Sequence, residues 1–356
     1  MDKKTISISS RLYDYSVNFI DNFKDKISEF GDNYTYVIDS NVYNLYLNDF
    51  SSIPKERIYL MDAVESKKNM ETVMDIIMFW KKLSVKKNWK VICFGGGITQ
   101  DVTTIASNIY LRNIDWYFFP TTLLAMCDSC IGGKCGINLA EYKNQIGVFY
   151  PPKRIYIDTT FINTLTDDDY LNGWGELLKF SLTDGKDFYD DLKKLDSFIP
   201  CKNIDEYIYR GLNVKKKIIE ADEFESDLRR VLNYGHTFGH ALEAYTHNSV
   251  PHGQGVIWGI DVVNYIAWKK GLISKDYYLD IKGLIKKEFF KKEVIIENPD
   301  TLFEIIKTDK KVKDDTLSFA LLDGFSHLII YPIRIDEDLR KLFTDYIKDT
   351  HEYYSN

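Results

Sequence analysis

Residues 91–101 read VICFGGGITQD, an apolar run that leads into three glycines and then into a more polar stretch. The apolar run predicts a buried β-strand. A glycine-rich turn into a helix lets backbone amides approach a phosphate or a ribose closely. The spacing differs from the dinucleotide fingerprint G-x-G-x-x-G, so a plain strand-to-helix turn explains the motif equally well on its own. Both interpretations place the stretch in an α/β fold.

The sequence on both sides repeats the same alternation. Strand and helix patterns alternate at 34–39 (strand), 67–84 (helix), 89–94 (strand), 100–111 (helix), 115–119 (strand) and 154–159 (strand). Such alternation is typical of a mostly parallel sheet flanked by helices. We therefore expect an N-terminal Rossmann-like α/β domain over residues 1–165.

The remaining residues, 166–356, predict a mostly α-helical domain. Helical patterns occupy 174–184, 204–221, 228–246, 254–270, 276–290 and 336–349. One β-hairpin is expected among them, with strands 317–322 and 327–333 joined around Asp323-Gly324.

Composition restricts the class of partner. The chain has 356 residues, 45% of them hydrophobic, and a net charge of -7, which argues against nucleic acid or an anionic membrane as the main partner. The N-terminus carries no apolar secretion segment, and no run of apolar residues is long enough to span a membrane. We expect a cytoplasmic protein whose anionic substrate, if it has one, is bound by clustered cations.

Two further motifs suggest small-molecule binding. Asp39 and Asn41 follow a predicted strand, where a carboxylate can bind ribose hydroxyls, although an Asx turn is the simpler interpretation of the pair. The stretch 120–147 contains a Gly-Gly-Lys turn at Lys134 and a Lys143-Asn144 pair, which could bind a phosphate. It lacks the Walker pattern.

The most specific signal is LNYGHTFGHALE, residues 232–243. If 228–246 is one helix, His236 and His240 share a face, and Arg229 and Asn233 continue it. Glu176, with Lys179 three residues later, and His252 at a helix start could complete a site for a catalytic divalent metal. By spacing alone, a pair of helical histidines is more often found as core or surface residues than as metal ligands.

Together these motifs resemble the 3-dehydroquinate synthase family, within the wider group of sugar-phosphate cyclases. The resemblance runs in order through VIDSN, GGGITQD, PTTLLAMCDSCIGGK, KNQIG, GELLK, ADEFESDLRRVLNYGHTFGH, PHG and DKK. It implies an NAD-binding α/β domain, a helical metal-binding domain, and an active site between them. It also implies a lyase of the shikimate pathway, and hence of aromatic amino acid biosynthesis.

The resemblance also assigns residues. It implies that Glu176, His236 and His252 bind zinc (or cobalt), and that His240 acts on the phosphate and its departing proton. The implied NAD-binding residues are Asp39, Asn41, Glu65, Lys68, Gly96, Gly97, Asp101, Thr121, Thr122, Lys143, Phe161 and Thr164. The implied substrate-binding residues are Asp128, Lys134, Asn144, Lys179, Lys215, Arg229, Asn233, His240 and Lys311. Arg112 corresponds to an arginine that reaches a neighbouring subunit, which implies a homodimer.

The implied substrate is 3-deoxy-D-arabino-heptulosonate 7-phosphate, and the products are 3-dehydroquinate and phosphate. Three departures from the family pattern leave an alternative open: Gln254 replaces a usual Glu, residues 135–138 read CGIN, and Phe224 replaces a usual Arg. The alternative is a related cyclase that acts on another sugar phosphate. A metal-dependent alcohol dehydrogenase shares the same overall plan, but it would release NADH.

Overall fold

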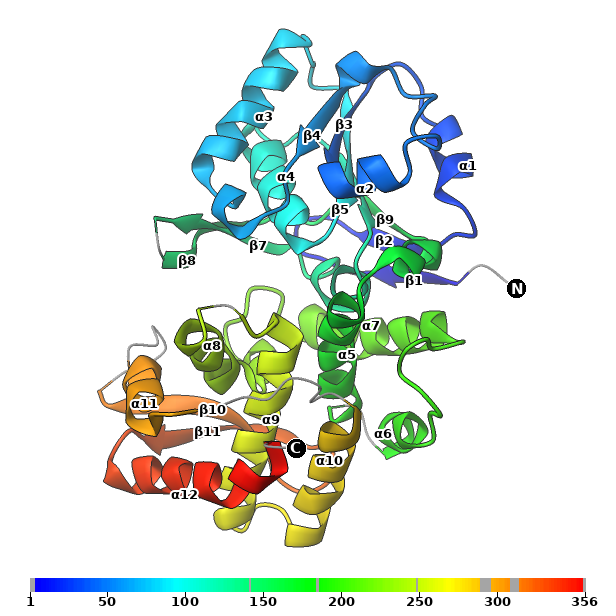
Figure 1. The fold of residues 1–356 in the computed structure, drawn as a ribbon. Helices are drawn as coiled ribbons and strands as arrows, with labels where there is room; N and C mark the ends of the chain where they lie inside the picture. Colours follow the sequence, from blue (N-terminus) through cyan, green and yellow to red (C-terminus); the bar gives the residue numbers. More distant parts are fainter. Residues whose placement is uncertain are drawn as a thin grey trace. The chain divides into compact units, whose positions relative to one another are not determined.

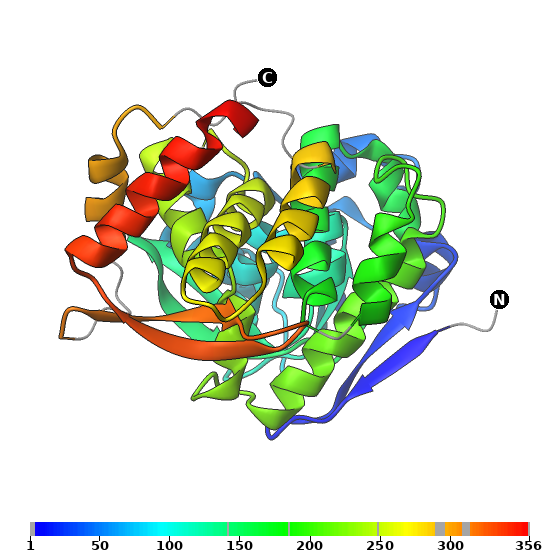
Figure 2. The ribbon, with the colours of Figure 1, turned by 90° about the horizontal axis from the view of Figure 1, so that it is seen from below.

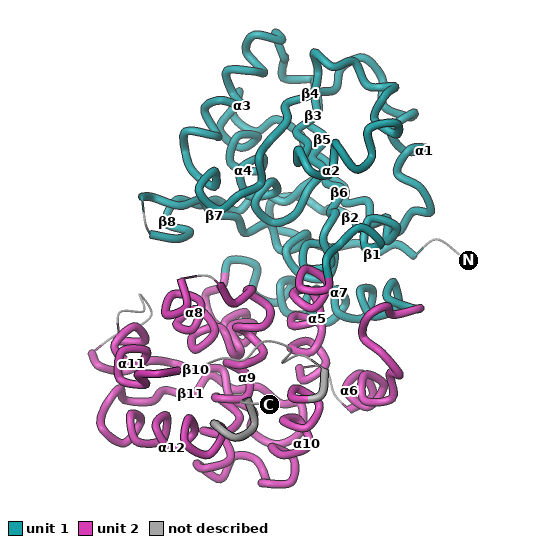
Figure 3. Tube along the Cα trace, in the orientation of Figure 1, with its two compact units in different colours: residues 1–166, 203–224 teal, residues 167–202, 225–356 magenta. Residues whose placement is uncertain are grey.

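The computed structural model describes residues 4–140, 142–183, 186–247, 249–288, 296–307 and 314–354 (Figure 1, and Figure 2 in a second view). The chain forms two compact units, coloured in Figure 3. Unit 1 comprises Met1–Thr166 and Asn203–Phe224, and unit 2 comprises Asp167–Lys202 and Glu225–Asn356.

Helix α7 (Ile204–Ala221) belongs to unit 1, whereas the sequence-based division placed every residue after 165 in the second domain. Helix α7 belongs to unit 1 because of the elements that its buried face contacts. That face packs against a π-helical turn, η3 (Ala125–Ser129), and against β1 of unit 1. A helical pattern identifies an apolar face, but it does not identify the element that covers it.

Unit 1 is built around a seven-stranded sheet within the described residues. Its strands, in spatial order, are β1 (Thr5–Ile8), β2 (Tyr15–Phe19), β9 (Arg154–Ile157), β6 (Trp116–Pro120), β5 (Lys90–Gly95), β3 (Tyr34–Asp39) and β4 (Ile58–Met61). Only the β1–β2 pair is antiparallel. The continuous apolar run of β5 is buried from Val91 to Phe94, as expected of a strand covered on both faces.

The helices of unit 1 are α1 (Phe23–Ser28), α2 (Ser40–Leu45), α3 (Met70–Lys82) and α4 (Gly97–Ile109), with 3-10 turns η1 (Lys55–Arg57), η2 (Glu65–Lys67) and η4 (Thr159–Thr164). Helix α4 packs on β5 and β6, with α3 beside it (Figure 1). A separate hairpin, β7 (Lys134–Leu139) and β8 (Tyr142–Phe149), occupies the stretch that the sequence left without assigned structure.

In unit 2, α9 (His252–Lys269) is the central helix. It packs against α5 (Asp167–Ser181), α8 (His236–Tyr245), α10 (Lys275–Glu288), α12 (Glu337–Tyr354) and strand β10 (Thr316–Leu322). The unit also contains α6 (Lys186–Lys193), η5 (Leu228–Asn233), α11 (Pro299–Lys307) and β11 (Leu328–Arg334). The expected hairpin is confirmed, because β10 and β11 pair antiparallel from Thr316↔Arg334 to Leu322↔Leu328. Within the described residues, no helix combines the length and apolar character needed to cross a bilayer.

The expected single helix over 228–246 is wrong. The chain forms the 3-10 helix η5, breaks at Gly235 with φ 78°, and begins α8 at His236. Gly235 takes this left-handed conformation where α9 lies very close, since a Cβ on Gly235 would come within 2.5 Å of Val256 O. Arg229 and Asn233 therefore do not continue the α8 face that carries His236.

Candidate functional site

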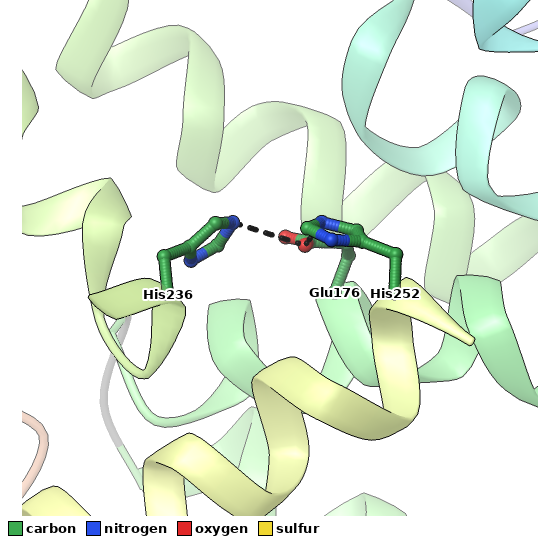
Figure 4. A group of neighbouring side chains, drawn as sticks. All are labelled: Glu176, His236 and His252. Carbon is green, nitrogen blue, oxygen red and sulfur yellow. Dashed lines mark ion pairs between the residues drawn. The ribbon is translucent and has the colours of Figure 1, made fainter. Parts of the chain in front are cut away.

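Three predicted metal ligands converge in unit 2. Glu176 comes from α5, and His236 and His252 are the first residues of α8 and α9 (Figure 4). Glu176 Oε1 lies 3.5 Å from His236 Nε2 and 3.6 Å from His252 Nε2. All three ligand atoms lie within 4.8 Å of one another. Two imidazole nitrogens and one carboxylate oxygen form the donor set of a catalytic zinc site with open coordination positions.

The Glu176 carboxylate tests whether a cation fits. Glu176 is 0% exposed, and its Oε1 has no hydrogen-bond partner among the described residues. Lys179, one turn later on α5, forms an ion pair with Oε2, which confirms that the two side chains face the same way. A buried carboxylate with unused lone pairs is costly unless something positively charged completes its coordination, so the residues present fit a divalent metal.

The electrostatics of this cluster also favour a cation. Burial by itself would raise the pKa of Glu176, but Lys179 and His236 together hold it well below its usual range. Burial and Lys179 lower the pKa of His236. Burial opposes charge on His252 too, yet the carboxylates of Glu176 and Glu243 raise its pKa to about 10. An environment that retains a proton on one imidazole also stabilises a bound divalent cation.

A glycine adjoins each of the three ligands, and each glycine allows close helix contact. A Cβ on Gly175 would come within 2.6 Å of Gly253 O, so α5 and α9 meet backbone to backbone beside Glu176 and His252. Gly235, next to His236, approaches α9 in the same way. These glycines account for the short distances between the ligands, because any larger residue would force the helices apart.

His240 lies one turn after His236 but outside the Glu176 cluster. Its side chain is exposed, and it groups instead with Glu243 and His252. The ring centroids of His240 and His252 are 5.6 Å apart. His240 is therefore beside the candidate metal site and exposed, and its separate role in the chemistry stays a prediction.

Two other predicted substrate residues of unit 2, Arg229 and Asn233, lie on η5. Arg229 is buried, with 5% of its surface exposed, whereas its neighbour Arg230 is only half-buried. Asn233 Nδ2 donates to Glu225 Oε1 at 2.9 Å. Lys311 lies outside the described residues.

In unit 1, the predicted NAD-binding residues Asp39 and Gly96 lie at the carboxyl edge of the sheet. Asp39 ends β3, Gly96 caps α4 directly after β5, and β3 and β5 are neighbours in the sheet. The chain passes from β3 to β4 on one side and then to β5 on the other, so a topological switch point lies here. Ligands of open α/β sheets bind at such points.

The α4 N-terminus fits a phosphate or ribose group. Gly96 supplies no side-chain cap, so the first backbone N–H groups of α4 stay available to an anion. A Cβ on Gly96 would come within 3.0 Å of Thr122 Cγ2, and Thr121 N donates to Gly95 O at 3.0 Å. Asp39 accepts from Asn41 N at 2.8 Å, which is the Asx interpretation, and its second oxygen is not used in that bond.

Four more predicted residues form one polar network. Lys68 Nζ lies 2.7 Å from Asp101 Oδ2 and donates to Asn144 Oδ1 at 2.8 Å. Glu65 Oε1 accepts from Asn138 Nδ2 at 2.7 Å. Asn138, which the sequence analysis missed, also accepts from Asn144 N at 3.0 Å, so it ties the β7–β8 hairpin to η2.

The remaining residues of unit 1 divide into buried and exposed ones. Phe161 is 1% exposed, and its ring centroid lies 4.7 Å from that of Phe23, so the ring belongs to the core. Lys215 Nζ, also buried, lies 2.9 Å from Asp128 Oδ1. Gly97 is the first residue of α4. Thr164 Oγ1 donates to Phe161 O at 3.0 Å. Lys134, Lys143 and Arg112 are exposed.

Solved structures share this fold. A 2-deoxy-scyllo-inosose synthase complexed with carbaglucose-6-phosphate, NAD+ and Co2+ has a TM-score of 0.85 and 22% identity, covering 96% of this chain and 99% of that chain. A 2-epi-5-epi-valiolone synthase from Streptomyces hygroscopicus with NAD+ and Zn2+ has a TM-score of 0.81 and 22% identity, covering 97% and 99%. The fold is therefore that of sugar-phosphate cyclases.

Relatives found by sequence define the family more narrowly than these solved structures do. The family models described as 3-dehydroquinate synthase N-terminal and C-terminal match residues 58–172 and 173–312. A 3-dehydroquinate synthase from Dictyoglomus turgidum is 33% identical over 355 residues, covering 97% of this chain and 98% of its own. One from Pelagibacter ubique is 35% identical over 319 residues, covering 86% of each. The chain belongs to the 3-dehydroquinate synthase family.

Proposed function

We propose that this chain converts 3-deoxy-D-arabino-heptulosonate 7-phosphate into 3-dehydroquinate and inorganic phosphate, with catalytic NAD and a divalent metal. One observation carries the proposal. Oε1 of buried Glu176, which has no hydrogen-bond partner among the described residues, lies within 3.6 Å of Nε2 of both His236 and His252. The family membership and the complete donor set support the proposal together.

The metal would be held by Glu176, His236 and His252. When bound, it would supply Lewis-acid chemistry that orients a substrate hydroxyl and makes it more acidic. Zinc is our proposal for the ion, with cobalt as the alternative, because the donor set suits both. Lys179 keeps Glu176 ionised and ready to bind it.

NAD would lie at the carboxyl edge of the sheet in unit 1. The N–H groups at the start of α4 would bind its phosphates, and Asp39 would accept hydrogen bonds from a ribose. When bound, NAD would supply reversible hydride chemistry, so the net reaction would be a phosphate elimination with ring closure. Lys68 and Asp101 hold the adjoining η2 and α4 in place.

The substrate is an anion at two ends, a phosphate and a carboxylate. We assign the carboxylate to Arg229, because a planar guanidinium binds a carboxylate through two parallel hydrogen bonds. His240 would orient the phosphate and take part in its proton transfer, since it is exposed beside His252. Asn233 and Lys179 in unit 2, and the Asp128–Lys215 pair in unit 1, are the further substrate-binding residues that the family resemblance implies.

Direct measurement of the proposed reaction tests the proposed function. The protein is incubated with the heptulosonate phosphate, NAD and zinc, and phosphate and product are measured. We expect stoichiometric phosphate and 3-dehydroquinate with no net NADH absorbance. Accumulating NADH would indicate an alcohol dehydrogenase, and preferred turnover of glucose 6-phosphate would indicate the specialised cyclase left open by Gln254. Gln254 is 3% exposed, two residues after His252.

We also propose a cytoplasmic homodimer in which Arg112 acts at the partner's site. Support comes from the family resemblance, in which Arg112 corresponds to an arginine that reaches a neighbouring subunit, and from the exposure of Arg112 in this structure. Mixing inactive Arg112→Ala and His240→Ala chains tests it. If Arg112 acts across the dimer, a mixed dimer has one complete site and regains activity. If Arg112 acts within its own chain, the mixture stays inactive.

A further inference from the structure

Glu243 on α8 is a buried carboxylate to which the proposed reaction gives no role. It is 8% exposed, and its Oε1 lies 2.8 Å from Nδ1 of His252. Glu243 lies three residues after His240 and seven after His236, which places it on the same face of α8. The carboxylate therefore contacts one candidate ligand from the side opposite to the metal.

The geometry at His252 uses both ring nitrogens. Nδ1 faces Glu243 at 2.8 Å, and Nε2 faces Glu176 Oε1 at 3.6 Å. When Nδ1–H donates to Glu243, the neutral tautomer that remains has its free lone pair on Nε2, which is the lone pair that a metal needs. His236 is held in a similar way, since its Nδ1 lies 3.1 Å from Tyr234 O. One ligand is thus oriented by a backbone carbonyl and the other by a carboxylate.

The helix packing leaves room for this contact. A Cβ on Gly255, three residues after His252, would come within 3.5 Å of Glu243 Cγ. A Cβ on Gly239 would meet Gly255 backbone atoms at 2.8 Å. The close approach of α8 and α9 at these two glycines brings Glu243 to His252.

We propose that Glu243 is a positioning residue that acts through His252. It fixes the tautomer and the ring orientation, and its negative charge strengthens the metal–imidazole bond. The inference rests on the proposed metal site of Glu176, His236 and His252. Removal of such an outer partner weakens metal binding by about 10–100-fold.

The experiment measures the affinity of the full chain for zinc alone, by competition with a chromophoric chelator. Glu243→Ala should bind zinc about 10–100-fold more weakly than wild type. Glu243→Gln keeps the side-chain volume and an acceptor oxygen, so we expect an intermediate affinity. In a His252→Ala background, Glu243→Ala should have little further effect, because the interaction it removes is already absent.

Asp261 on α9 provides the matched control. It is 1% exposed, and its Oδ2 accepts from Lys282 Nζ and Tyr346 Oη, both at 2.9 Å. Asp261→Asn should lower the thermal stability without changing zinc affinity. A Glu243 variant that loses stability alone is therefore distinguishable from one that loses the metal.

Two results would overturn the inference while leaving the metal site intact. One is wild-type zinc affinity in Glu243→Ala, or in Glu243→Gln if the alanine variant does not fold, alongside weakened binding in His252→Ala. The other is a Glu243→Ala penalty that persists undiminished in the His252→Ala background. Failure of the wild type to bind zinc would instead refute the proposed function.

Discussion

Gly259 of α9 lies against the carbonyl oxygen of Gly235, so closely that a Cβ on Gly259 would come within 1.9 Å of it. Gly235 precedes His236, and Gly259 lies two turns after His252. The contact therefore sets the separation of α8 and α9, and with it the distance between the two histidines. Gly235 and Gly259 therefore help to set the geometry of the candidate metal site.

Gly259→Ala tests this relationship. The added methyl group must push the helices apart, so we expect a loss of about 1–3 kcal/mol in the free energy of unfolding, with weaker zinc binding. Gly283→Ala on α10 is the control, since nothing lies within 4 Å of its Cβ position, and it should stabilise by about 0.5–1 kcal/mol. Urea unfolding measures both. Unchanged stability in Gly259→Ala would show that the helices separate at no cost.

The sequence predicted the bounds of an element well where the residues of that element alone determine its pattern. The strand over 34–39 and the helix over 204–221 match β3 and α7 residue for residue. The break at Gly235 escaped prediction because it depends on α9, which comes later in the chain. The short strands β1 and β2 were missed since four or five alternating residues give little signal.

In the candidate site, too, contacts within one helix were predictable from spacing, whereas contacts between elements were not. The three-residue spacing of Glu176 and Lys179 on one helix predicts that their side chains face the same way, and they form an ion pair. Glu243 was missed, although its position seven residues after His236 was a usable signal. Asn138 could not have been found, because its role depends on how the β7–β8 hairpin meets η2.

The ion pair between Lys68 and Asp101 predicts how the stability of the fold depends on pH. Burial raises the pKa of Asp101, and Lys68 opposes this rise. A carboxyl with a raised pKa destabilises the fold as the pH increases through that pKa, and removing Lys68 raises it further. Lys68→Met should therefore cost about 1–3 kcal/mol of stability at neutral pH and less in acid, where Asp101 is protonated.

The Asp101→Asn background provides the control for that measurement. With no carboxylate left to ionise, the cost of Lys68→Met should no longer vary with pH. Unfolding free energies of the four chains at several pH values decide the matter. A cost that is the same in acid and at neutral pH in the wild-type background would show that Lys68 does not act through the charge of Asp101.

His240→Ala should separate chemistry from metal binding. The exposed imidazole lies outside the Glu176 cluster, so zinc and NAD affinities should stay near their wild-type values. Phosphate release should slow by about 10²–10⁴-fold, the usual contribution of a positioned acid–base group. Rapid-quench measurement of phosphate gives the rate. Loss of the metal in this variant would mean that ligand and catalyst have been exchanged.

Arg229→Ala should impair the use of the carboxylate-bearing substrate. Losing a buried charge-assisted pair costs about 2–5 kcal/mol, and we expect this loss in kcat/KM for the heptulosonate phosphate. Arg230→Ala, at the neighbouring half-buried position, should change little. Steady-state kinetics of both variants measure the effect. Equal effects of the two changes would leave the carboxylate without its assigned partner.

Zinc content tests the central claim most directly. The wild type and the variants Glu176→Ala, His236→Ala and His252→Ala are dialysed against the same dilute zinc buffer and analysed by atomic absorption. We predict one equivalent of zinc in the wild type, and a large loss of zinc in each variant together with a loss of phosphate release. A full equivalent retained in all three variants would contradict the assignment of the metal to Glu176, His236 and His252.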